Sequence, residues 1–536
     1  MRAVRRRLLP GSPAVVVLAS VLLFVASLLW AVFVPDFRAP DELQHVNSVV
    51  RVAEGGGWPA PGHVRIEDET LGALALSGAI AGGPRTILPG AADVPPGATR
   101  FADLTPVRAS DRASFRDLDH GPRQGGPIDQ MTQHPPGWYA VAAVVYDLSG
   151  ASNWRYDRAI FLLRALTALV VAVTVPACCY VAARQLSGSQ TVGRTAAFVP
   201  LLIPQLQFVS GAVTNDGATI AATSAIWAVL FTLTSSGPTR RRLLALAVVV
   251  GAACWTKGTA LTLLPGIPVA IAIAYRRARG GTLRNWGAPA LAAGVGVLGL
   301  AFVLGGWWWA LNVVRYGRLQ PAAYLVPPGS SPTLGVGQFL AVFADRMRWS
   351  FFGDLGVLHA PSLNALTITL TVVFAVLCAL GLVARARIAD RLLIVLAGCA
   401  VTGVLFTSAY RAHLESHNLA GLQGRYLFVL VVPIAACFAA GLARLAPVTR
   451  PAGRWHPLSV LVAGLTVTVL GLLLGFRLYY AVAGEPWAAT TDRFLGWSAW
   501  PLPAVGGLAA AFVVVAALSA WRLASEPRTG VPAAGA

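Results

Sequence analysis

Charged residues are scarce in this 536-residue chain: aspartate, glutamate, lysine and arginine make up 12% of it, about half of the roughly 25% that is usual in soluble domains. Hydrophobic residues reach 56%, and the mean hydropathy is +0.64. This balance excludes a string of soluble domains and indicates a polytopic membrane protein. The net charge of +19 comes from arginines in short clusters between apolar runs, so we predict no nucleic-acid partner.

Cysteine is also rare, and the long polar stretches contain none. All six cysteines lie within apolar runs, which excludes a disulfide framework in the polar loops and is typical of small buried hydrophobes. The sequence has no Walker loop, no HExxH and no CxxC pair, so it gives no support to ATP hydrolysis or zinc proteolysis. The six are Cys178, Cys179, Cys254, Cys378, Cys399 and Cys437.

Long apolar runs, in contrast, are abundant. The first, about Ala14 to Val34, is long enough to cross a bilayer core of about 30 Å, and no small-residue cleavage site follows it, so we predict an uncleaved transmembrane helix. Further runs bring the prediction to an all-α polytopic protein with about twelve transmembrane helices. They lie near Ala159–Ala183, Ala196–Val213, Ala218–Leu233, Leu243–Trp255, Ala260–Tyr275, Ala288–Leu311, Leu363–Val383, Leu392–Tyr410, Tyr426–Leu442, Leu458–Tyr480 and Leu502–Trp521.

The distribution of arginine tests this count. If the spans alternate in direction, the clusters that contain only basic residues fall on one face, and the acidic or mixed loops fall on the other. Because basic clusters stay on the cytoplasmic side, we predict a multi-pass plasma-membrane protein with both termini in the cytoplasm. The predicted division is 1–34, cytoplasmic N-terminus and first transmembrane helix; 35–148, long outer loop; 149–311, core transmembrane helices; 312–362, second outer loop; 363–522, C-terminal transmembrane helices; and 523–536, cytoplasmic tail.

Both long outer loops are predicted to contain interfacial helices. The stretch from Glu42 to Ala53 has apolar residues at helical spacing and stops before three glycines, so it should be an amphipathic helix along the membrane surface. The stretch from His134 to Leu148 is apolar but short for a span, and is predicted as an interfacial or re-entrant helix.

The most unusual feature is an acidic pair, Asp41-Glu42, soon after the first span. Two neighbouring carboxylates beside hydrocarbon resist ionisation together, so their position calls for water, a cation or a substrate. We interpret the pair as the catalytic centre, with His45 as a substrate-binding candidate beside it.

Two cations on the predicted outer side are candidates for binding phosphate. Lys257 is the only lysine in the chain. Either its side chain snorkels from a helix end to the membrane surface, or its compact positive charge binds a phosphate, and we favour phosphate binding. Arg425 heads a span together with Gln423 and Tyr426. It too can snorkel, or it can grip a phosphate through two parallel hydrogen bonds.

Other polar residues on this side are candidates for substrate contacts. His134 begins the helix after the first loop, where the two following prolines have an ordinary structural role in the first turn. Asp354 stands among aromatic residues that normally anchor a protein at the membrane interface. Asn215-Asp216 precedes a glycine, and turn chemistry alone explains that sequence; we keep both residues as candidates.

Together these motifs resemble a known family. PDELQH after the first span, then HPPGWY, NDG, TKG, WSFFGDLG and QGRYLF occur in this order between Asp36 and Pro433. The set is similar to a bacterial membrane-protein family, domain of unknown function 2142, within the GT-C glycosyltransferase superfamily. The resemblance implies a GT-C-like fold and an inverting transferase that takes a sugar from a polyprenyl-phosphate donor.

The resemblance also implies roles for the candidate residues. Asp41 would be the general base for the acceptor hydroxyl, and Glu42 would orient that hydroxyl or help to hold a cation. Lys257 and Arg425 would bind the donor phosphate, with His134 as an auxiliary. Some relatives need a divalent metal and others do not, so a divalent-cation cofactor stays an open alternative and no metal ligand is assigned.

The predicted function is transfer of a sugar from a polyprenyl-phosphate donor to a cell-envelope glycan or glycolipid acceptor, at the outer face of the plasma membrane. The lipid bilayer is itself a partner, because it retains the polyprenyl tail. A transporter or flippase of a lipid-linked sugar is the alternative, although such proteins usually carry ionisable groups near the membrane midplane and internal repeats. A non-catalytic scaffold would leave the outer motifs unexplained.

Overall fold

The computed structural model describes residues 12–78, 87–88, 99–119, 127–322, 329, 332–355, 364–383, 387–419, 421–447 and 455–525. These residues form an almost wholly helical protein, in which the only strands described are β1 (Ile87–Leu88) and β2 (Thr99–Arg100), a two-residue parallel pair. The all-α prediction is confirmed. The predicted cytoplasmic segment before residue 12 and the tail after residue 525 lie outside the described residues.

The helices fall into three groups. Those of the bundle are α1 (Ser12–Phe33), α5 (Tyr156–Ser187), α6 (Gln190–Phe198), α7 (Pro204–Ser210), α8 (Asn215–Ser236), α9 (Arg240–Cys254), α10 (Gly266–Arg279), α11 (Leu283–Ala301), α12 (Trp307–Tyr316), α14 (Asn364–Leu382), α15 (Ile388–Ser416), α16 (Val431–Leu445), α17 (His456–Tyr480) and α19 (Leu502–Ala524). Those of the loops are α2 (Glu42–Ala53), α3 (Asp68–Leu76), α4 (Gly137–Leu148), α13 (Val336–Gly353) and α18 (Trp487–Trp497). Short 3-10 or π turns are η2 (Phe101–Asp103), η3 (Ala109–Asp111), η4 (Phe115–Asp117), η5 (Gln130–Gln133), η6 (Ala151–Asn153), η7 (Val199–Leu202), η8 (Gly258–Leu263), η9 (Phe302–Gly306) and η11 (Gly424–Leu430).

Ten of the described helices, with the short turns continuous with them, are long and apolar enough to cross a membrane. A further apolar pair, α6 with η7 and α7, is bent by 74° and makes an eleventh if the two helices form one span. Pro204 begins α7, and a proline lacks the N–H that would continue the preceding helix. The twelfth predicted span corresponds to α9, which packs against α8 and α11 but, with 15 residues, is not among the ten helices long enough to cross. The chain is therefore a multi-pass membrane protein.

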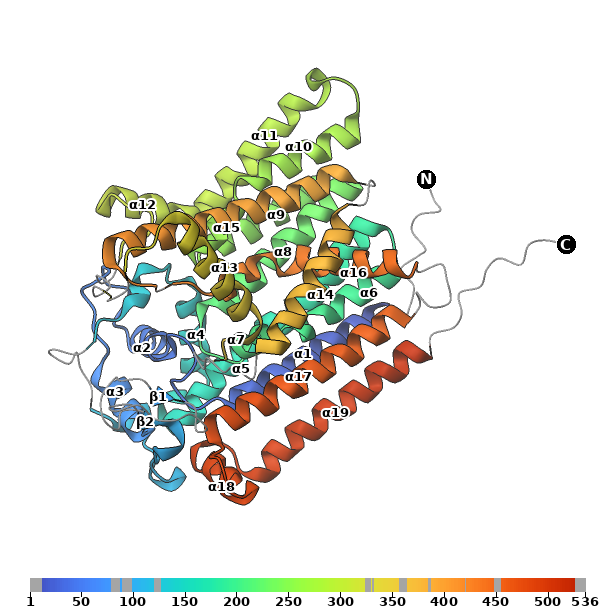
Figure 1. The fold of residues 1–536 in the computed structure, drawn as a ribbon. Coiled ribbons are helices and arrows are strands. Elements are labelled where there is room, and N and C mark those ends of the chain that lie inside the picture. Colours follow the sequence, from blue (N-terminus) through green and yellow to red (C-terminus); the bar gives the residue numbers. More distant parts are fainter. Residues whose placement is uncertain are drawn as a thin grey trace.

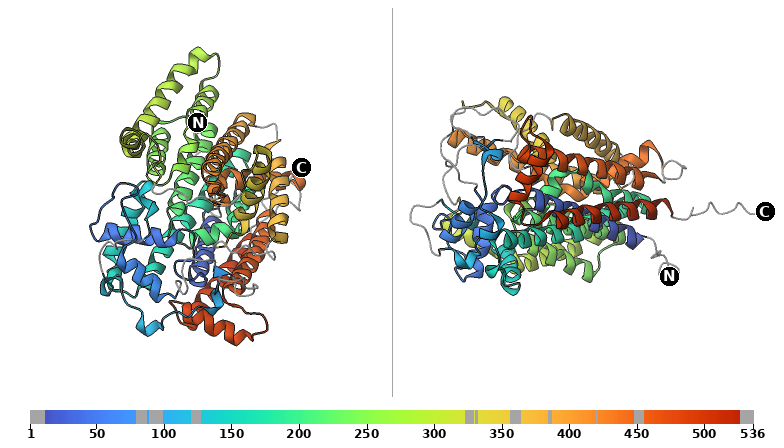
Figure 2. Two further views of the ribbon diagram at one scale, coloured as in Figure 1. Left: turned by 60° about the vertical axis from the view of Figure 1, so that its left-hand side comes forward. Right: turned by 90° about the horizontal axis from the view of Figure 1, so that it is seen from below.

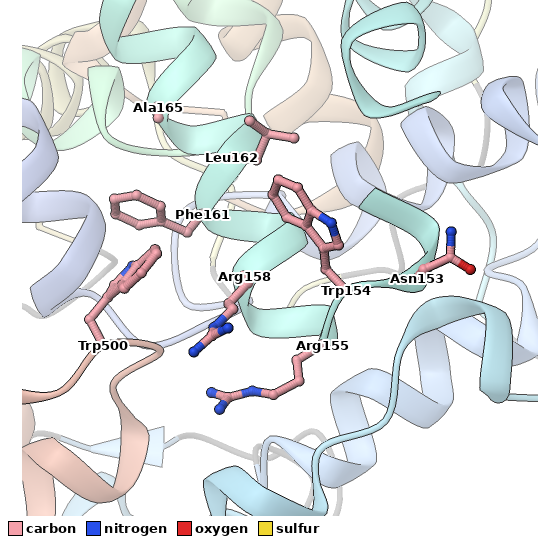
Figure 3. Close-up of a pocket in the computed structure, with 8 residues that line it drawn as sticks. All are labelled: Asn153, Trp154, Arg155, Arg158, Phe161, Leu162, Ala165 and Trp500. Carbon is pink, nitrogen blue, oxygen red and sulfur yellow. The ribbon is translucent and has the colours of Figure 1, made fainter. Parts of the chain in front are cut away.

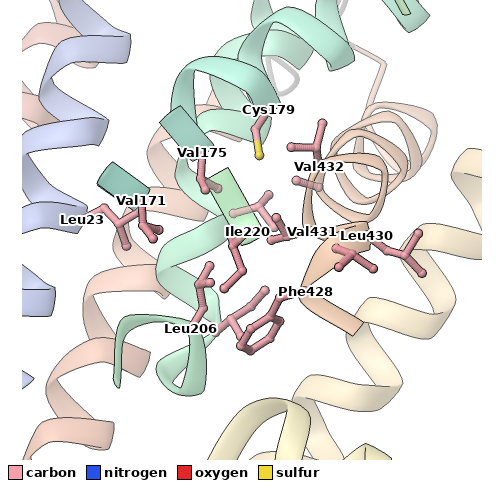
Figure 4. Close-up of a cluster of buried hydrophobic side chains, with 14 of the residues drawn as sticks. Leu23, Val171, Val175, Cys179, Leu206, Ile220, Phe428, Leu430, Val431 and Val432 are labelled. Atoms are coloured by element: carbon pink, nitrogen blue, oxygen red, sulfur yellow. The ribbon is translucent and has the colours of Figure 1, made fainter. Parts of the chain in front are cut away.

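The central helix of the bundle is α5, with 32 residues. It packs against α1, α6, α8 and α16, which lie beside it in Figures 1 and 2. Gly217 on α8 allows a close approach to α5, because a Cβ at this position would collide with the Thr167 side chain. Figure 4 shows the apolar side chains at this junction, among them Leu23 of α1, Val171 and Val175 of α5, Leu206 of α7, Ile220 of α8, Phe428 of η11 and Val431 of α16.

The helices of the first loop gather at one end of the bundle, which we call the loop end (Figure 1). The bounds of α2 are those predicted, but α3, α4 and η5 contact it, and eight of its 12 residues are buried. A helix is also confirmed at α4, which has 12 residues and is too short to span. The start of α1 and the end of α19 lie together at the opposite end of the bundle (Figures 1 and 2).

Candidate active site

An ion-pair network at the loop end joins four of the predicted residues: Asp41, Asp216, Lys257 and Arg425. Arg425 is its central member, with Nη2 2.9 Å from Asp41 Oδ2 and Nη1 3.2 Å from Asp216 Oδ2. The ammonium of Lys257 donates to Asp216 Oδ1 at 2.6 Å. Residues far apart in the sequence thus form one group, which we call the four-charge cluster.

Asp41 is placed by the turn between α1 and α2. Its φ is 60°, in the left-handed region, which aspartate adopts more readily than most residues. Gln130 donates to its Oδ1 at 3.3 Å and to Gln44 Oε1 at 2.9 Å. The Asp41 side chain is 35% exposed, whereas those of Asp216 and Arg425 are 6% and 3% exposed. Asp41 is therefore the carboxylate of the cluster that a substrate can reach.

Asp216 and Lys257 are placed by the beginnings of two helices. Thr214 caps α8, because its Oγ1 accepts a hydrogen bond from the Asp216 N–H at 3.2 Å. Lys257 is extended immediately before η8. The Asn215 side chain donates to the Thr256 carbonyl at 3.3 Å. The Asn215-Asp216 pair therefore joins the start of α8 to the segment that carries Lys257.

Arg425 is placed by a close approach between η11 and α13. The Gly424 N–H donates to Ser350 Oγ at 2.6 Å, and a Cβ at Gly424 would collide with the backbone of Phe351. Gln423 Oε1 accepts from Arg425 Nε at 2.6 Å. These contacts fix the direction in which the guanidinium extends.

Tyr426 faces both cations of the cluster. The centroid of its ring lies 4.9 Å from Lys257 Nζ and 5.5 Å from Arg425 Cζ. An aromatic face attracts cations through its quadrupole. Tyr426 therefore helps to keep the two positive charges on one side of the site.

The charges of the cluster cancel, since two carboxylates stand against one guanidinium and one ammonium. Burial alone would raise the pKa of Asp41, but the adjacent Arg425, with Lys257 nearby, holds that pKa below its ordinary value. Asp41 is therefore ionised at neutral pH. Such a carboxylate can accept a proton from a hydroxyl group placed beside it.

His45 and His134 lie near the cluster as neutral imidazoles. Burial lowers the pKa of His45 to about 3 and lowers the pKa of His134 well below its ordinary value. His45 Nδ1 is 2.9 Å from the Tyr139 hydroxyl, and its Nε2 is 3.4 Å from Thr214 Oγ1. His134 Nδ1 has no hydrogen-bond partner among the described residues. A neutral imidazole has one donor and one acceptor nitrogen, so His134 can hydrogen-bond to a substrate but offers no positive charge.

Asp354 ends α13 on the side of Arg425. Burial raises its pKa to about 6, although Arg425 and Arg346 act in the opposite direction. Its side chain is buried. Asp354 thus belongs to the surroundings of the cluster and carries less charge than an exposed aspartate near neutral pH.

Glu42, predicted as a catalytic residue, lies apart from the cluster. Its side chain is fully buried, and Arg164 donates to both of its oxygens, from Nε at 2.8 Å and from Nη2 at 2.6 Å. The Val213 N–H also donates to Oε1, at 3.1 Å. Because the Glu42 carboxylate is fully buried and bound by Arg164, it is not within reach of a substrate hydroxyl. It anchors the start of α2 to α5, and these contacts support a structural role, while its catalytic role stays a prediction.

Three residues around the site were not identified from the sequence: Arg164, Gln130 and Tyr139. An arginine within an apolar span is itself a signal of a buried partner, so Arg164 could have been found. Gln130 reaches Asp41 across 89 residues and Tyr139 reaches His45 across 94. No local pattern marks such contacts.

No group of three histidine, cysteine, aspartate or glutamate side chains that could hold a metal occurs within the described ranges. In the four-charge cluster, each carboxylate has a cationic side chain as its partner. The divalent cation stays a prediction that rests on the family resemblance.

Asp36, beside Arg164, should make stability depend on pH. Burial raises the pKa of Asp36 to about 7, even though Arg164 Nη1 lies 3.6 Å from its Oδ1. Between its ordinary pKa of 3.8 and this value, the folded state keeps a proton that the unfolded chain has lost. The resulting stabilisation is complete below about pH 4 and is lost as the pH rises through about 7.

Asp36→Asn keeps a neutral side chain at every pH and should therefore raise the unfolding temperature more at pH 8 than at pH 5. We expect a gain of roughly 2 °C or more at pH 8 in detergent solution. Asp492→Asn, at an exposed position on α18, is the matched control. A gain of equal size at both pH values would contradict a proton on Asp36.

A known family, described as "Predicted membrane protein (DUF2142)", matches residues 23–435. No curated protein matches the chain. Among solved structures, ArnT from Cupriavidus metallidurans bound to undecaprenyl phosphate is similar with a TM-score of 0.45 and 16% identity, over 96% of this chain and 77% of that one. Arabinosyltransferase EmbB from Mycobacterium smegmatis has a TM-score of 0.38 and 14% identity, over 97% of this chain and 42% of that one. The oligosaccharyltransferase of Archaeoglobus fulgidus in complex with zinc and sulfate has a TM-score of 0.38 and 11% identity, over 86% and 57%.

Proposed function

The chain belongs to the DUF2142 family of predicted membrane proteins, and we propose that it is a membrane glycosyltransferase. The proposed reaction moves a sugar from a polyprenyl-phosphate donor to a hydroxyl of a cell-envelope glycan or glycolipid. One observation carries the proposal: in a multi-pass protein, an ionised and partly exposed Asp41 lies next to two buried cations. Transfer of a sugar from a phosphate to an alcohol needs a base and a cationic site for the leaving group.

Asp41 is proposed as the general base. An acceptor hydroxyl beside its carboxylate would give up its proton as the hydroxyl oxygen attacks the anomeric carbon of the donor sugar. The bond from that carbon to the phosphate oxygen breaks on the opposite face, so the anomeric configuration inverts. The bonding electron pair leaves with the polyprenyl phosphate, and the proton passes from Asp41 to water.

Arg425 and Lys257 are proposed to bind the leaving phosphate. Their present partners are carboxylates, and a phosphate offers the same kind of oxygen acceptor with a greater negative charge. Arg425 presents two guanidinium nitrogens, one toward Asp41 and one toward Asp216, so it can also hold two phosphate oxygens. The phosphate would displace Asp216 in part and bring its ester bond close to Asp41.

Two unpaired acceptors are proposed to bind hydroxyl groups of the sugar. Asn215 Oδ1 and His134 Nδ1 are buried and have no hydrogen-bond partner among the described residues. A buried acceptor without a partner is unfavourable, and a sugar hydroxyl can donate to it. Because His134 is neutral, it can accept such a bond.

We place the loop end at the outer face of the plasma membrane. The opposite end of the bundle carries the arginines that begin α9 and those in the last turn of α10. Clusters of this kind stay in the cytoplasm. A polyprenyl donor would then present its phosphate at the outer interface while its tail stays in the bilayer.

The proposal is tested by incubating membranes that contain the protein with radiolabelled polyprenyl-phosphate sugars. A labelled glycan or glycolipid that requires the protein is the expected result, and its label identifies the donor. The proposal is contradicted if no donor gives a product and the protein instead moves the lipid-linked sugar across the membrane of vesicles. The protein would then be a flippase.

Lys257→Gln should weaken donor binding, because it removes a charged partner of the phosphate. The expected rise in donor KM is about ten- to a hundredfold, the range for a lost hydrogen bond to a charged group. Arg315→Gln, at an exposed position on α12, is the control. An unchanged donor KM in a Lys257→Gln protein of wild-type unfolding temperature would remove Lys257 from the phosphate site.

A further inference from the structure

A second feature of the molecule, a cavity of about 640 Å³, lies on the flank of the bundle at the start of α5. Its walls come from η6, from the first turns of α5 and from the segment before α19 (Figure 3). None of its lining residues belongs to the four-charge cluster. The sugar-transfer mechanism therefore makes no use of it.

Two arginines give this cavity a positive rim. Arg155 donates to both oxygens of the buried Asp157, at 3.1 and 2.5 Å, and Arg112 binds the same carboxylate at 2.6 Å. The Arg158 backbone N–H donates to Asp157 Oδ1 at 2.9 Å, but its exposed guanidinium forms no ion pair within the described residues; the guanidinium Cζ lies 5.5 Å from the centroid of the Trp500 ring. Figure 3 shows the two guanidinium groups of the rim on the same side of the cavity. The Asp157 carboxylate is shared by Arg155 and the buried Arg112, whereas the Arg158 guanidinium is not ion-paired, so the rim keeps a positive charge at Arg158.

The rest of the lining is apolar or aromatic. Phe161, Leu162 and Ala165 continue the wall along α5, and Trp154 and Trp500 flank them (Figure 3). The rings of Phe161 and Trp500 meet edge to face, 5.2 Å apart. The Trp500 Nε1 is buried without a hydrogen-bond partner in the described part of the chain. A positive rim, a free indole donor and an apolar wall together match an anionic amphiphile.

The length of α5 puts the rim at the depth of lipid headgroups. Its 32 residues extend over about 48 Å at about 1.5 Å each, whereas the hydrocarbon core of a bilayer is about 30 Å thick. Because Asp157 and Arg158 lie in the first turn of α5 and Arg155 directly precedes it, the excess length at this end belongs in the headgroup layer, where arginine and tryptophan are favoured. Deeper lining residues such as Ala165 then face the upper part of the acyl chains.

We propose that this cavity binds an anionic membrane phospholipid, with the lipid phosphate at Arg158 and Arg155 and an acyl chain along Leu162 and Ala165. A free phosphate would satisfy the arginines but would leave the apolar wall exposed, so the lipid is the better match. The bound lipid bridges α5 and the segment before α19, because Trp500 and the rim arginines both contact it. Binding should therefore stabilise the fold.

The test uses the purified full-length protein, delipidated in a neutral detergent. Phosphatidylglycerol, phosphatidylcholine with the same acyl chains, inorganic phosphate and a polyprenyl phosphate are titrated separately. Binding is followed by native mass spectrometry and stabilisation by the unfolding temperature. We expect phosphatidylglycerol to bind more tightly than the other three and to raise the unfolding temperature.

Three variants distinguish binding in the cavity from attraction to general surface charge. Each is first shown to unfold at the wild-type temperature without lipid. Arg158→Gln should weaken phosphatidylglycerol binding about fivefold, as expected for one arginine near an anionic headgroup. Ala165→Trp, which fills the cavity without changing its charge, should weaken it by at least as much. Arg315→Gln, an exposed arginine outside the cavity, should have no effect.

Several results would overturn the proposal. Equal binding of phosphatidylglycerol and phosphatidylcholine would show that the arginines do not select the anionic headgroup. Loss of binding in Arg315→Gln as large as in Arg158→Gln, with Ala165→Trp unaffected, would indicate attraction to the surface alone. Tighter binding of inorganic phosphate or of polyprenyl phosphate would assign the cavity to a free anion or to the lipid carrier. Each of these outcomes is independent of whether sugar transfer is detected.

Discussion

Asp41→Asn is expected to lower the rate of sugar transfer about 10²- to 10⁴-fold, the loss typical of removing a general base. The change replaces the proton-accepting carboxylate of Asp41, which is 35% exposed and is the carboxylate of the four-charge cluster that a substrate can reach. Arg425 and Lys257 stay in place, so the donor should still bind. Initial rates with saturating donor and acceptor measure the loss in kcat.

Asparagine is the suitable replacement because Asp41 has a left-handed backbone, with φ at 60°. Asparagine adopts this conformation readily, whereas alanine would add strain to the loss of charge. The unfolding temperature of Asp41→Asn should therefore stay close to that of the wild type. Asp111→Asn, an exposed position in the same loop, is the matched control and should keep full activity.

The pH profile gives an independent check on the same residue. Because the pKa of Asp41 lies below its ordinary value of 3.8, the base is already deprotonated in acid, and Asp41 should cause no loss of kcat/KM between about pH 7 and pH 5. Full activity in Asp41→Asn with an identified donor would refute the role as base. An inactive variant that has also lost donor binding would make Asp41 a binding residue instead.

Arg164→Met should strongly destabilise the fold. It leaves the Glu42 carboxylate charged, buried and without its guanidinium, and removing one partner of such a pair lowers the free energy of unfolding by about 3–5 kcal/mol. Arg164 also donates to three backbone carbonyls near the end of α1, which would lose their partners. These carbonyls belong to Ala31, Val34 and Pro35.

The measurement is the unfolding temperature, with the yield of folded protein, for Arg164→Met, Glu42→Gln and the double variant. The double variant should be less destabilised than the sum of the two single ones, because neither charge is then left alone. Arg184→Met, in the last turn of the same helix, is the control for losing an arginine from α5. If Glu42→Gln has wild-type stability but no transfer activity, Glu42 has a catalytic role.

Helices of this protein can be predicted from sequence because their signals are local. The apolar spacing from Glu42 and the glycines that follow Ala53 set both ends of α2 at the predicted residues. The apolar runs likewise predicted α5 and its neighbours. The bend at Pro204, between α6 with η7 and α7, was not predicted, since the apolar run Ala196–Val213 indicates a single span, although proline is a local signal of it. Each of these features depends on residues within a few turns of one another.

Side-chain partners could not be predicted in the same way. Asp41 and Glu42 are adjacent in sequence and were interpreted as one unit, but Asp41 is left-handed while Glu42 begins a helix, so their carboxylates point to different partners. Asp216 looked like part of a turn because its ion pairs come from Lys257 and Arg425, which are distant in the chain. Only the packing of α8, η8 and η11 brings these three residues together.

Synthesis of the chain supplies the residues of the four-charge cluster in a fixed order, because Arg425 follows Asp41 by 384 residues. A nascent chain acquires Asp41 first, then Asp216 with Lys257, and only much later the guanidinium that joins them. Until η11 has been translated, Asp41 is a carboxylate without its ion-pair partner, and water is the better environment for it. Completion of the site therefore belongs to the last stages of membrane insertion, and a product that terminates before Arg425 retains most of the bundle's helices but no assembled site.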